Sequence, residues 1–204
     1  MIFVITGPSG CGKSTLAGLV LHKVANLEFS VSHTTRIKRD SEEEGRDYYF
    51  VPGKEFEKMI KEKKFVEWAE VHGHCYGTSR KELEKKGALG DLLLDIDVQG
   101  AQQIKEKYKK AVFIFILPPS FAELKRRLQA RGQESSASVQ KRLDVAKKEI
   151  RHYSQFDFLV VNDNLDKAAA ELESIVVSTR CRLKVRQKEV LPILRSFYEE
   201  KGGA

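Results

Sequence analysis

The sequence predicts an α/β protein, a three-layer sandwich in which helices cover both faces of a central parallel sheet. Two observations support this fold class. Short apolar runs are followed repeatedly by residues at helical spacing, which is the pattern of parallel strands joined by crossover helices. A glycine-rich loop also stands directly between the first apolar run and the first helical pattern.

Four apolar runs are expected to form buried strands of this sheet, at residues 2–6, 92–96, 112–117 and 158–161. Helices are expected after the glycine loop and at 98–107, 120–131 and 166–188. Residues 190–198 predict one more amphipathic helix. Packing of that helix onto the core is the favoured expectation, and a dimer contact is the alternative.

Residues 29–89 differ from this pattern, because they form shorter polar and aromatic pieces. Two of these pieces, DYYFV and FVEWAEV, alternate in a way that predicts exposed antiparallel strands. We therefore expect an inserted mixed α+β subdomain at 29–89. The core would then comprise 1–28 and 90–204, with a helical lid at about 132–152.

Composition excludes several classes of protein. Of the 204 residues, 41% are hydrophobic and 32% charged, which is typical of a globular chain and not of a disordered one. The longest apolar run, residues 111–117, is far shorter than a membrane span. The start of the chain, MIFVITG, has no signal-peptide pattern, and the three cysteines lie far apart. A cytoplasmic protein without a membrane partner is expected.

The chain is basic, with 36 Lys and Arg against 29 Asp and Glu. Such an excess fits nucleic acid, an acidic membrane surface or small polyanionic substrates, and the charge alone does not choose among them. Basic residues cluster near the C-terminus at Arg180, Arg182, Lys184, Arg186 and Lys188. A solvated helix face is the favoured interpretation of this cluster, and an RNA or lipid contact is the alternative.

Residues 7–14 match the pattern G-x-x-x-x-G-K-[ST] between a predicted strand and a predicted helix. Glycines let the backbone N–H groups turn inward, and the helix N-terminus adds partial positive charge. In such a loop Lys13 would reach the β- and γ-phosphates and Ser14 would bind Mg²⁺. A nucleoside triphosphate is therefore expected against the following residues: Gly7, Pro8, Ser9, Gly10, Cys11, Gly12, Lys13, Ser14 and Thr15.

The strand predicted at 92–96 leads into two carboxylates, Asp95 and Asp97, in the sequence LLLDIDVQG. An acid at this place lies beside the phosphate loop and holds Mg²⁺ directly or through water. Residues 97–100 also spell D-x-x-G, as in GTPase switch regions. No N-K-x-D motif for reading the base follows, and this argues against a GTPase.

Further motifs resemble one family. The segments SVSHTTRIKRDSEEEGRDYYF, EWAEVHGHCYGTS, LLLDIDVQGA, LKRRLQARG and VNDNLDKA occur in order, from about residue 2 to 170. Together they resemble guanylate kinases, which phosphorylate GMP from ATP. The resemblance implies a P-loop core, an inserted GMP-binding subdomain and a lid. It also implies ATP and GMP as substrates, Mg²⁺ as cofactor and direct in-line phosphoryl transfer.

The resemblance also implies roles for particular residues. The GMP phosphate would be held by Ser32, Arg36, Arg39, Tyr48 and Tyr76, and the guanine by Glu67 and Thr78. Asp95 and Asp97 would serve the base or ribose and the magnesium shell in a division that stays open, with Ser14 and Asp95 taken as the metal ligands. The catalytic residues would be Lys13, Arg39, Arg127, Arg131 and Arg142, and Asn162 would contact adenine.

The chemistry of guanine fits Glu67. Its N1–H and exocyclic amine form a donor pair that one carboxylate accepts, while the Thr78 hydroxyl can donate to O6. Lys38, where proline is common, and Cys75, in place of an aromatic residue, depart from the family pattern without removing a functional group.

The alternative function is that of the guanylate-kinase-like domains of membrane-associated scaffolds, which bind protein ligands. Those domains typically lack an intact phosphate loop, whereas Gly12, Lys13 and Ser14 are all present here. We expect a monomer or homodimer that acts on small molecules, and we do not expect a nucleic-acid partner.

Overall fold

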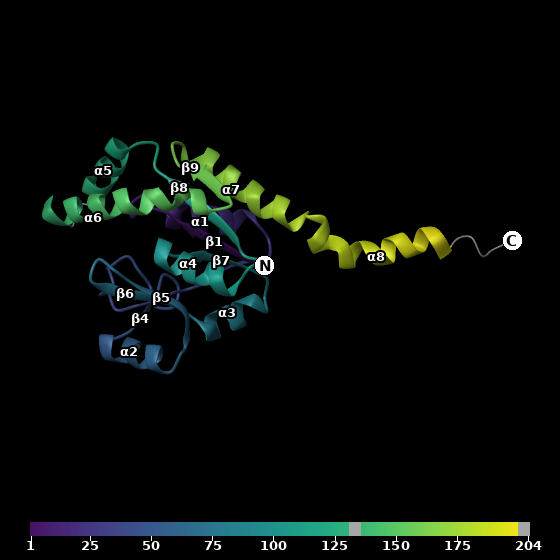
Figure 1. Cartoon of the computed structure of the whole chain (residues 1–204), viewed down its shortest axis with the longest axis horizontal. Helices are drawn as coiled ribbons and strands as arrows, with labels where there is room; N and C mark the ends of the chain where they lie inside the picture. The colour runs from purple at the N-terminus through teal and green to yellow at the C-terminus, as the bar shows by residue number, and fades with distance from the viewer. Residues whose placement is uncertain (131–135, 200–204) are drawn as a thin grey trace.

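The computed structural model describes residues 1–130 and 136–199. Its centre is a five-stranded sheet with the strand order β2-β7-β1-β8-β9, in which all neighbours are parallel (Figure 1). The strands are β1 (Ile2–Thr6), β2 (Leu27–Phe29), β7 (Asp91–Asp95), β8 (Val112–Leu117) and β9 (Phe158–Val161). The predicted parallel sheet is confirmed, and β2 is an edge strand that the sequence analysis did not include.

The strand register brings the carboxyl ends of the central strands to one edge of the sheet. Ile5 of β1 lies opposite Asp95 of β7 on one side and opposite Ile114 of β8 on the other. Ligands of open α/β sheets bind at this edge. The loop that follows β1 and the acid that ends β7 therefore leave the sheet side by side.

Helices bury both faces of the sheet. On one face Phe3 and Ile5 pack among residues of α1 (Lys13–Lys23) and α7 (Leu165–Arg180). On the other, Val4 and Leu94 pack against α4 (Val98–Lys107) and α3 (Arg80–Gly87). Because successive side chains of a strand point to opposite faces, burial on both sides explains the continuous apolar runs.

A second sheet has the strand order β4-β3-β6-β5. Its strands are β3 (His33–Thr34), β4 (Tyr49–Phe50), β5 (Phe65–Val71) and β6 (His74–Ser79), and α2 (Gly53–Lys61) lies between β4 and β5 along the chain. The prediction of exposed antiparallel strands is right in direction for β5 with β6, but most residues of β5 are buried, and β4 runs parallel to β3. Helix α2 packs here through Phe56, whose ring stacks on Phe65 with centroids 4.5 Å apart.

Two helices near the phosphate loop share an apolar cluster of their own. Helix α5 (Phe121–Ala130) and helix α6 (Ser136–Glu149) pack through Leu124, Leu128, Val139, Leu143 and Ala146, and a 3₁₀ helix, η1 (Ile150–Gln155), follows. The segment expected as a lid, about 132–152, thus contains α6 and the first half of η1. Arg131 lies outside the described residues.

The C-terminal region differs from the prediction. A helix at 166–188 was expected, but α7 ends at Arg180 and α8 (Leu183–Glu199) starts after a short break. At the break the N–H of Arg182 donates to the carbonyl of Thr179, an i→i−3 bond of 3.2 Å that interrupts the α-helical ladder.

Helix α8 runs away from the body of the molecule (Figure 1), so the expectation that residues 190–198 pack onto the core is wrong. Leu183 and Phe197 are 75% and 72% exposed. The amphipathic pattern indicated a helix with an apolar face, but it carried no information about what covers that face. Among the described helices, none has the length and apolar composition needed to cross a membrane.

Because α8 buries so little, removing it should hardly change stability. Truncation after Arg182 is expected to move the thermal midpoint by less than about 2 °C. Leu172→Ala in α7 is the contrasting variant, because Leu172 is fully buried, and it should cost about 2–5 kcal/mol. Thermal unfolding of both proteins checks this. A truncated chain as unstable as the Leu172 variant would contradict the arrangement.

Candidate active site

The glycine-rich loop connects β1 to α1 and has a conformation that only glycine adopts readily. Gly7, Gly10 and Gly12 have φ values of 146°, 91° and 97°. A Cβ atom on Gly12 would lie 2.3 Å from Asn162 Nδ2, and one on Gly7 would lie 2.2 Å from the carbonyl oxygen of Ile116. The loop is therefore packed closely against the ends of β8 and β9, which fixes its shape.

Lys13 folds back over this loop, and its Nζ donates to the carbonyl oxygen of Gly7 at 2.8 Å. Burial opposes its charge, but the neighbouring Cys11 and Asp95 outweigh that effect and raise the pKa of Lys13. The ammonium group therefore stays positive at neutral pH. It is in place to meet an anionic ligand.

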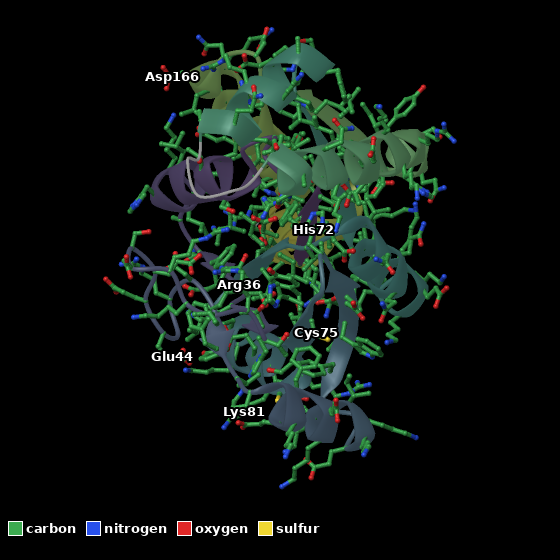
Figure 2. The ribbon with its side chains drawn as sticks, turned by 90° about the vertical axis from the view of Figure 1, so that its left-hand side faces the viewer. Arg36, Glu44, His72, Cys75, Lys81 and Asp166 are labelled. Atoms are coloured by element: carbon green, nitrogen blue, oxygen red, sulfur yellow. The ribbon has the colours of Figure 1, made fainter. Side chains whose placement is uncertain are left out.

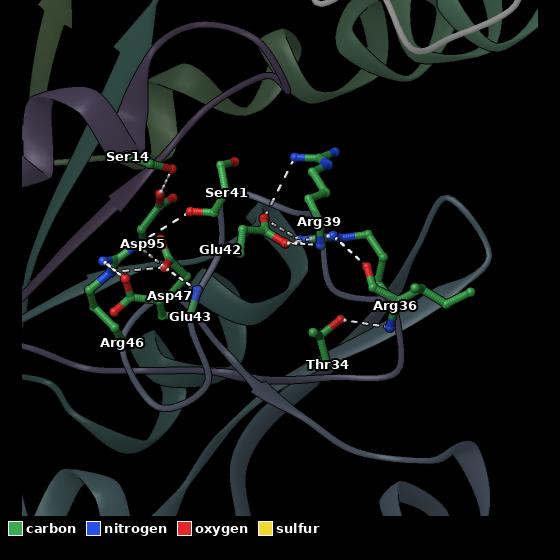
Figure 3. A network of polar contacts seen from close by, with 11 residues as sticks. Ser14, Thr34, Arg36, Arg39, Ser41, Glu42, Glu43, Arg46, Asp47 and Asp95 are labelled. Atoms are coloured by element: carbon green, nitrogen blue, oxygen red, sulfur yellow. Dashed lines mark hydrogen bonds and ion pairs between the residues drawn. The ribbon is translucent and has the colours of Figure 1, made fainter.

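Ser14 and Asp95 form a hydrogen-bonded pair next to Lys13. The Ser14 hydroxyl donates to Asp95 Oδ2 at 2.8 Å (Figure 3). Burial raises the pKa of Asp95, while the charge of Lys13 and the bond from Ser14 oppose that rise. The two residues come from different segments and meet because β1 and β7 end at the same edge of the sheet.

Three of the other residues expected at the ATP site contact the glycine-rich loop, namely Asn162, Arg127 and Arg142. Asn162 Nδ2 donates to the carbonyl oxygen of Cys11 at 2.8 Å. Arg127 donates from Nη2 to the carbonyl oxygen of Asn162 at 3.0 Å and from Nε to Glu123 at 2.8 Å. Arg142, on α6, lies with Nη1 3.3 Å from Ser9 Oγ. Helices α5 and α6 thus bring cations to the loop.

Glu67 is a buried carboxylate at the other end of the site. It lies on β5, is 2% exposed, and accepts from the N–H of Thr78 on β6 at 2.8 Å. Gly100 makes room for it, because a Cβ there would lie 2.5 Å from Glu67 Oε2. The Thr78 hydroxyl is buried beside the acid, and among the described residues it has no partner of good hydrogen-bond geometry.

Burial raises the pKa of Glu67 to about 7. The negative charge of Asp97 adds to the rise, and the contacts with Thr78 oppose it. No cation forms an ion pair with this carboxylate among the described residues. A buried acid of this kind is suited to a ligand that presents N–H donors.

The hydrogen bonds of Asp97 lie within the first turn of α4, whose Gly100 also approaches Glu67. The Asp97 side chain caps α4 by accepting from the N–H of Gly100 at 2.9 Å, and it also accepts from Gln99 at 3.3 Å. Asp95, in contrast, bonds Ser14 of the loop. The two acids, which the sequence could not tell apart, therefore differ in their hydrogen-bond partners.

The residues expected at the GMP phosphate form a third group, around Arg36. Its guanidinium carbon lies 5.4 Å from the ring centroid of Tyr48, and the rings of Tyr48 and Tyr76 are 5.9 Å apart. Ser32 is buried just before β3. Burial raises the pKa of Tyr48, and the negative charge of Asp95 adds to this. Figure 2 shows Arg36 near the middle of this side of the molecule.

Two acidic residues that the sequence analysis did not single out hold the arginines of the site. Glu42 accepts from Nη1 and Nη2 of Arg36 and contacts Arg39 as well (Figure 3). Glu123 holds Arg127, and hydrogen bonds from Arg126 and Arg127 lower the pKa of Glu123 to about 2. Glu42 stands in the acidic run 42–44, which looks like an ordinary solvated stretch.

Comparison with known proteins places this site in one family. The family model described as guanylate kinase matches residues 1–179. The guanylate kinase of Geobacter metallireducens is 48% identical over 89% of this chain and 90% of its own length. That of Thermotoga maritima is 47% identical over 93% of this chain and 92% of its own.

Solved structures agree with this. The crystal structure of guanylate kinase from Anaplasma phagocytophilum has a TM-score of 0.75 at 36% identity, covering 89% of this chain and 87% of that one. Shikimate kinase from Bacteroides thetaiotaomicron, with a TM-score of 0.53 at 14% identity, covers 86% of this chain and 98% of its own and shares the fold alone. With a matching family model over most of its length and relatives near half identity, the chain belongs to the guanylate kinase family.

Proposed function

We propose that this protein transfers the γ-phosphate of ATP to GMP and releases ADP and GDP, the reaction of the guanylate kinase family. The observation that carries the proposal is the pairing of two unlike sites in one fold. A glycine loop with a charged Lys13 suits a triphosphate. The buried Glu67 beside Thr78 suits one particular base.

Recognition of guanine follows from the hydrogen bonds that the site leaves open. The Glu67 carboxylate can accept from N1–H and the exocyclic amine of guanine, and the Thr78 hydroxyl can donate to O6. Adenine presents the reverse pattern at these positions, so it would leave a buried carboxylate unpaired. A site of this kind discriminates by about 10⁴-fold. Asp97, next to Glu67, is assigned to the base or ribose.

Mg²⁺ fits the oxygen pair of Ser14 and Asp95. These two oxygens lie 2.8 Å apart beside the phosphate loop, and Mg²⁺ prefers oxygen ligands supplied jointly by protein and phosphates. No cluster of three His, Cys, Asp or Glu residues able to hold a metal occurs in the described part of the chain, which fits a site completed by substrate oxygens. When bound, the ion neutralises charge on the phosphate oxygens.

For phosphoryl transfer the protein supplies position and positive charge. Lys13 holds the β- and γ-phosphates of ATP, and Arg39, Arg127 and Arg142 stabilise the charge that spreads over the transferred group. Arg131, which lies outside the described residues, is assigned to the same task from the family pattern. Asn162 is assigned to adenine, in addition to its bond to the loop. A GMP phosphate oxygen then attacks in line, without a covalent enzyme intermediate.

Water competes with GMP as the nucleophile, so the site has to exclude it. We assign this task to closure of the lid at about 132–152 and of the GMP-binding subdomain at 29–89. The contact between Arg142 of α6 and Ser9 of the glycine-rich loop supports this assignment, because it joins the segment expected as a lid to that loop. Closure would bring the lid cations onto the reacting phosphates only when both nucleotides are bound.

We also propose that the protein works in the cytoplasm as a monomer or homodimer. Cys11, Cys75 and Cys181 are all free thiols, and free thiols persist where glutathione keeps the compartment reduced.

The first prediction concerns base selection. ADP formation from ATP is expected with GMP and, at least about 10³-fold more weakly, with AMP, CMP or UMP. Glu67→Gln should remove most of the preference for GMP, because an amide cannot accept two hydrogen bonds through two oxygens. A coupled assay for ADP with the four nucleotides in parallel measures both. An unchanged preference in the variant would overturn the assignment of Glu67.

The second prediction concerns pH. Because the pKa of Glu67 is raised to about 7, the empty site holds a protonated acid below that pH and a carboxylate above it. Only the carboxylate accepts both guanine donors, so the KM for GMP should rise by up to about tenfold per unit as the pH falls below 7.

The control for this prediction is the pH profile of Glu67→Gln, measured at higher GMP concentrations. Glutamine does not titrate, whereas the phosphate of GMP titrates equally in both proteins. The difference between the two profiles therefore reports Glu67 alone. Parallel profiles would show that Glu67 does not titrate in this range.

The third prediction concerns magnesium. Asp95→Asn should raise the Mg²⁺ concentration that gives half-maximal activity, because a charged oxygen ligand is lost. Asp166→Asn, at an exposed position in the first turn of α7, is the matched control and should leave it unchanged. Activity titrated with Mg²⁺ at saturating ATP and GMP measures the effect. Equal requirements in the two variants would exclude Asp95 from the metal site.

A further inference from the structure

The two arginines assigned to the GMP phosphate are not free in this structure, because both contact the carboxylate of Glu42 (Figure 3). Arg36 donates from Nη1 to Oε2 at 3.0 Å and from Nη2 to Oε1 at 2.8 Å, a bidentate fork. Arg39 donates its backbone N–H to Oε2 at 2.9 Å, and its Nη1 lies 3.7 Å from Oε1. One carboxylate thus joins both arginines.

Glu42 is itself held in place by burial and by hydrogen bonds with the backbone of its own turn. Its side chain is 12% exposed, and its own N–H donates to the carbonyl oxygen of Arg39 at 3.0 Å, which closes a turn. Burial alone would raise the pKa of Glu42, but the bonds from Arg36 and Arg39 outweigh it and lower the pKa. The group therefore stays ionised. A phosphate that displaced its carboxylate would also take the acceptor from the backbone N–H of Arg39.

The Arg36 guanidinium is held from several directions. Besides its fork with Glu42, Nη1 donates to the carbonyl oxygen of Ile37 at 2.8 Å. The rings of Tyr48 and Phe50 lie 5.4 and 5.9 Å from its central carbon. An arginine side chain loses rotamer entropy when it is fixed, so contacts made before a ligand arrives remove that cost from binding.

The negative charge of Glu42 has a second effect, which opposes phosphate binding. One carboxylate against two guanidinium groups weakens the attraction for phosphate, but it leaves the cluster positive. The positioning of the arginines strengthens phosphate binding, and the negative charge of Glu42 weakens it. Because the carboxylate is bonded to the backbone of its own turn, it supports the arginines and does not exchange with the ligand, so the positioning effect is the larger.

We propose that Glu42 is a positioning residue for the GMP phosphate, whose carboxylate orients the Arg36 guanidinium and the Arg39 turn before the nucleotide binds. This inference rests on the proposed function. Glu42 acts through the two arginines and does not contact the reacting atoms.

The test compares Glu42→Gln with Glu43→Gln. Glu43 is the matched control, because it lies next in the same loop but is 66% exposed and pairs with Arg46 instead. The Kd for GMP, inhibition by guanosine, and the KM and kcat for both substrates are measured for each variant and for the unaltered protein. Guanosine carries the same base without the phosphate, so it separates the phosphate site from the guanine site.

Glu42→Gln should weaken GMP binding by about tenfold or more, since a hydrogen-bonded charge pair is lost. Inhibition by guanosine and the KM for ATP should stay unchanged, kcat should change much less than the KM for GMP, and Glu43→Gln should resemble the unaltered protein. Glu42→Asp keeps the charge but shortens the side chain, and it should recover part of the loss.

Three outcomes would overturn the proposal. Equal or tighter GMP binding by Glu42→Gln would show that the carboxylate competes with the phosphate. Equal losses for GMP and guanosine would show a general structural role. Weaker GMP binding by Glu43→Gln to the same extent would show that only loop charge matters. If the unaltered protein bound no GMP at all, the proposed function itself would fail, which is a separate result.

Discussion

The parallel register of β1, β7 and β8 is the constraint on which the site depends. It brings the loop after Thr6 and the carboxylate of Asp95 to the same edge of the sheet, although 81 positions separate Ser14 from Asp95 along the chain. The cores on both faces keep the strands in this register, because a slip of one residue would turn Phe3 and Ile5 toward the wrong helices. The packing that stabilises the sheet therefore also fixes the geometry of the phosphate loop.

The second sheet buries an acid, Glu67, that forms no ion pair with any of the described residues. Glu67 is held by the backbone N–H of Thr78 across the β5–β6 pair, in a space that exists because residue 100 is glycine. Burial of such a group costs free energy in the empty protein. Guanine donors would offset that cost on binding. The same burial that makes the empty site unfavourable would thus give it selectivity for one base, as proposed above.

The arginines of the site show a shared design. Arg36 is held by Glu42, and Arg127 is held by Glu123. In each case a carboxylate orients a guanidinium group before any nucleotide binds. Preorganised cations stabilise a developing charge without the reorganisation that mobile side chains would need.

Much of the fold and of the candidate site could be predicted from the sequence, and the predictions that were wrong or missing have physical causes. Residues 2–14 combine an apolar run with a glycine-rich loop motif. This local pattern was enough to predict both the strand β1 and a nucleoside triphosphate as the ligand of the loop. The placement of Glu42 depends on a turn between Arg39 and Glu42, and an acidic run gives no sign of it. Helix α8 was predicted from its periodicity, but periodicity describes one helix and not its neighbours. The β3–β4 pairing likewise depends on contacts between distant segments.

The central claim is that one crevice holds both nucleotides, the triphosphate on the glycine loop and the guanine on Glu67. Calorimetry with adenosine and guanosine joined by five phosphates tests it most directly. The account predicts one molecule bound per chain, at least about 100-fold more tightly than ATP or GMP alone, because the second contact becomes intramolecular. An affinity no higher than that for ATP would contradict it.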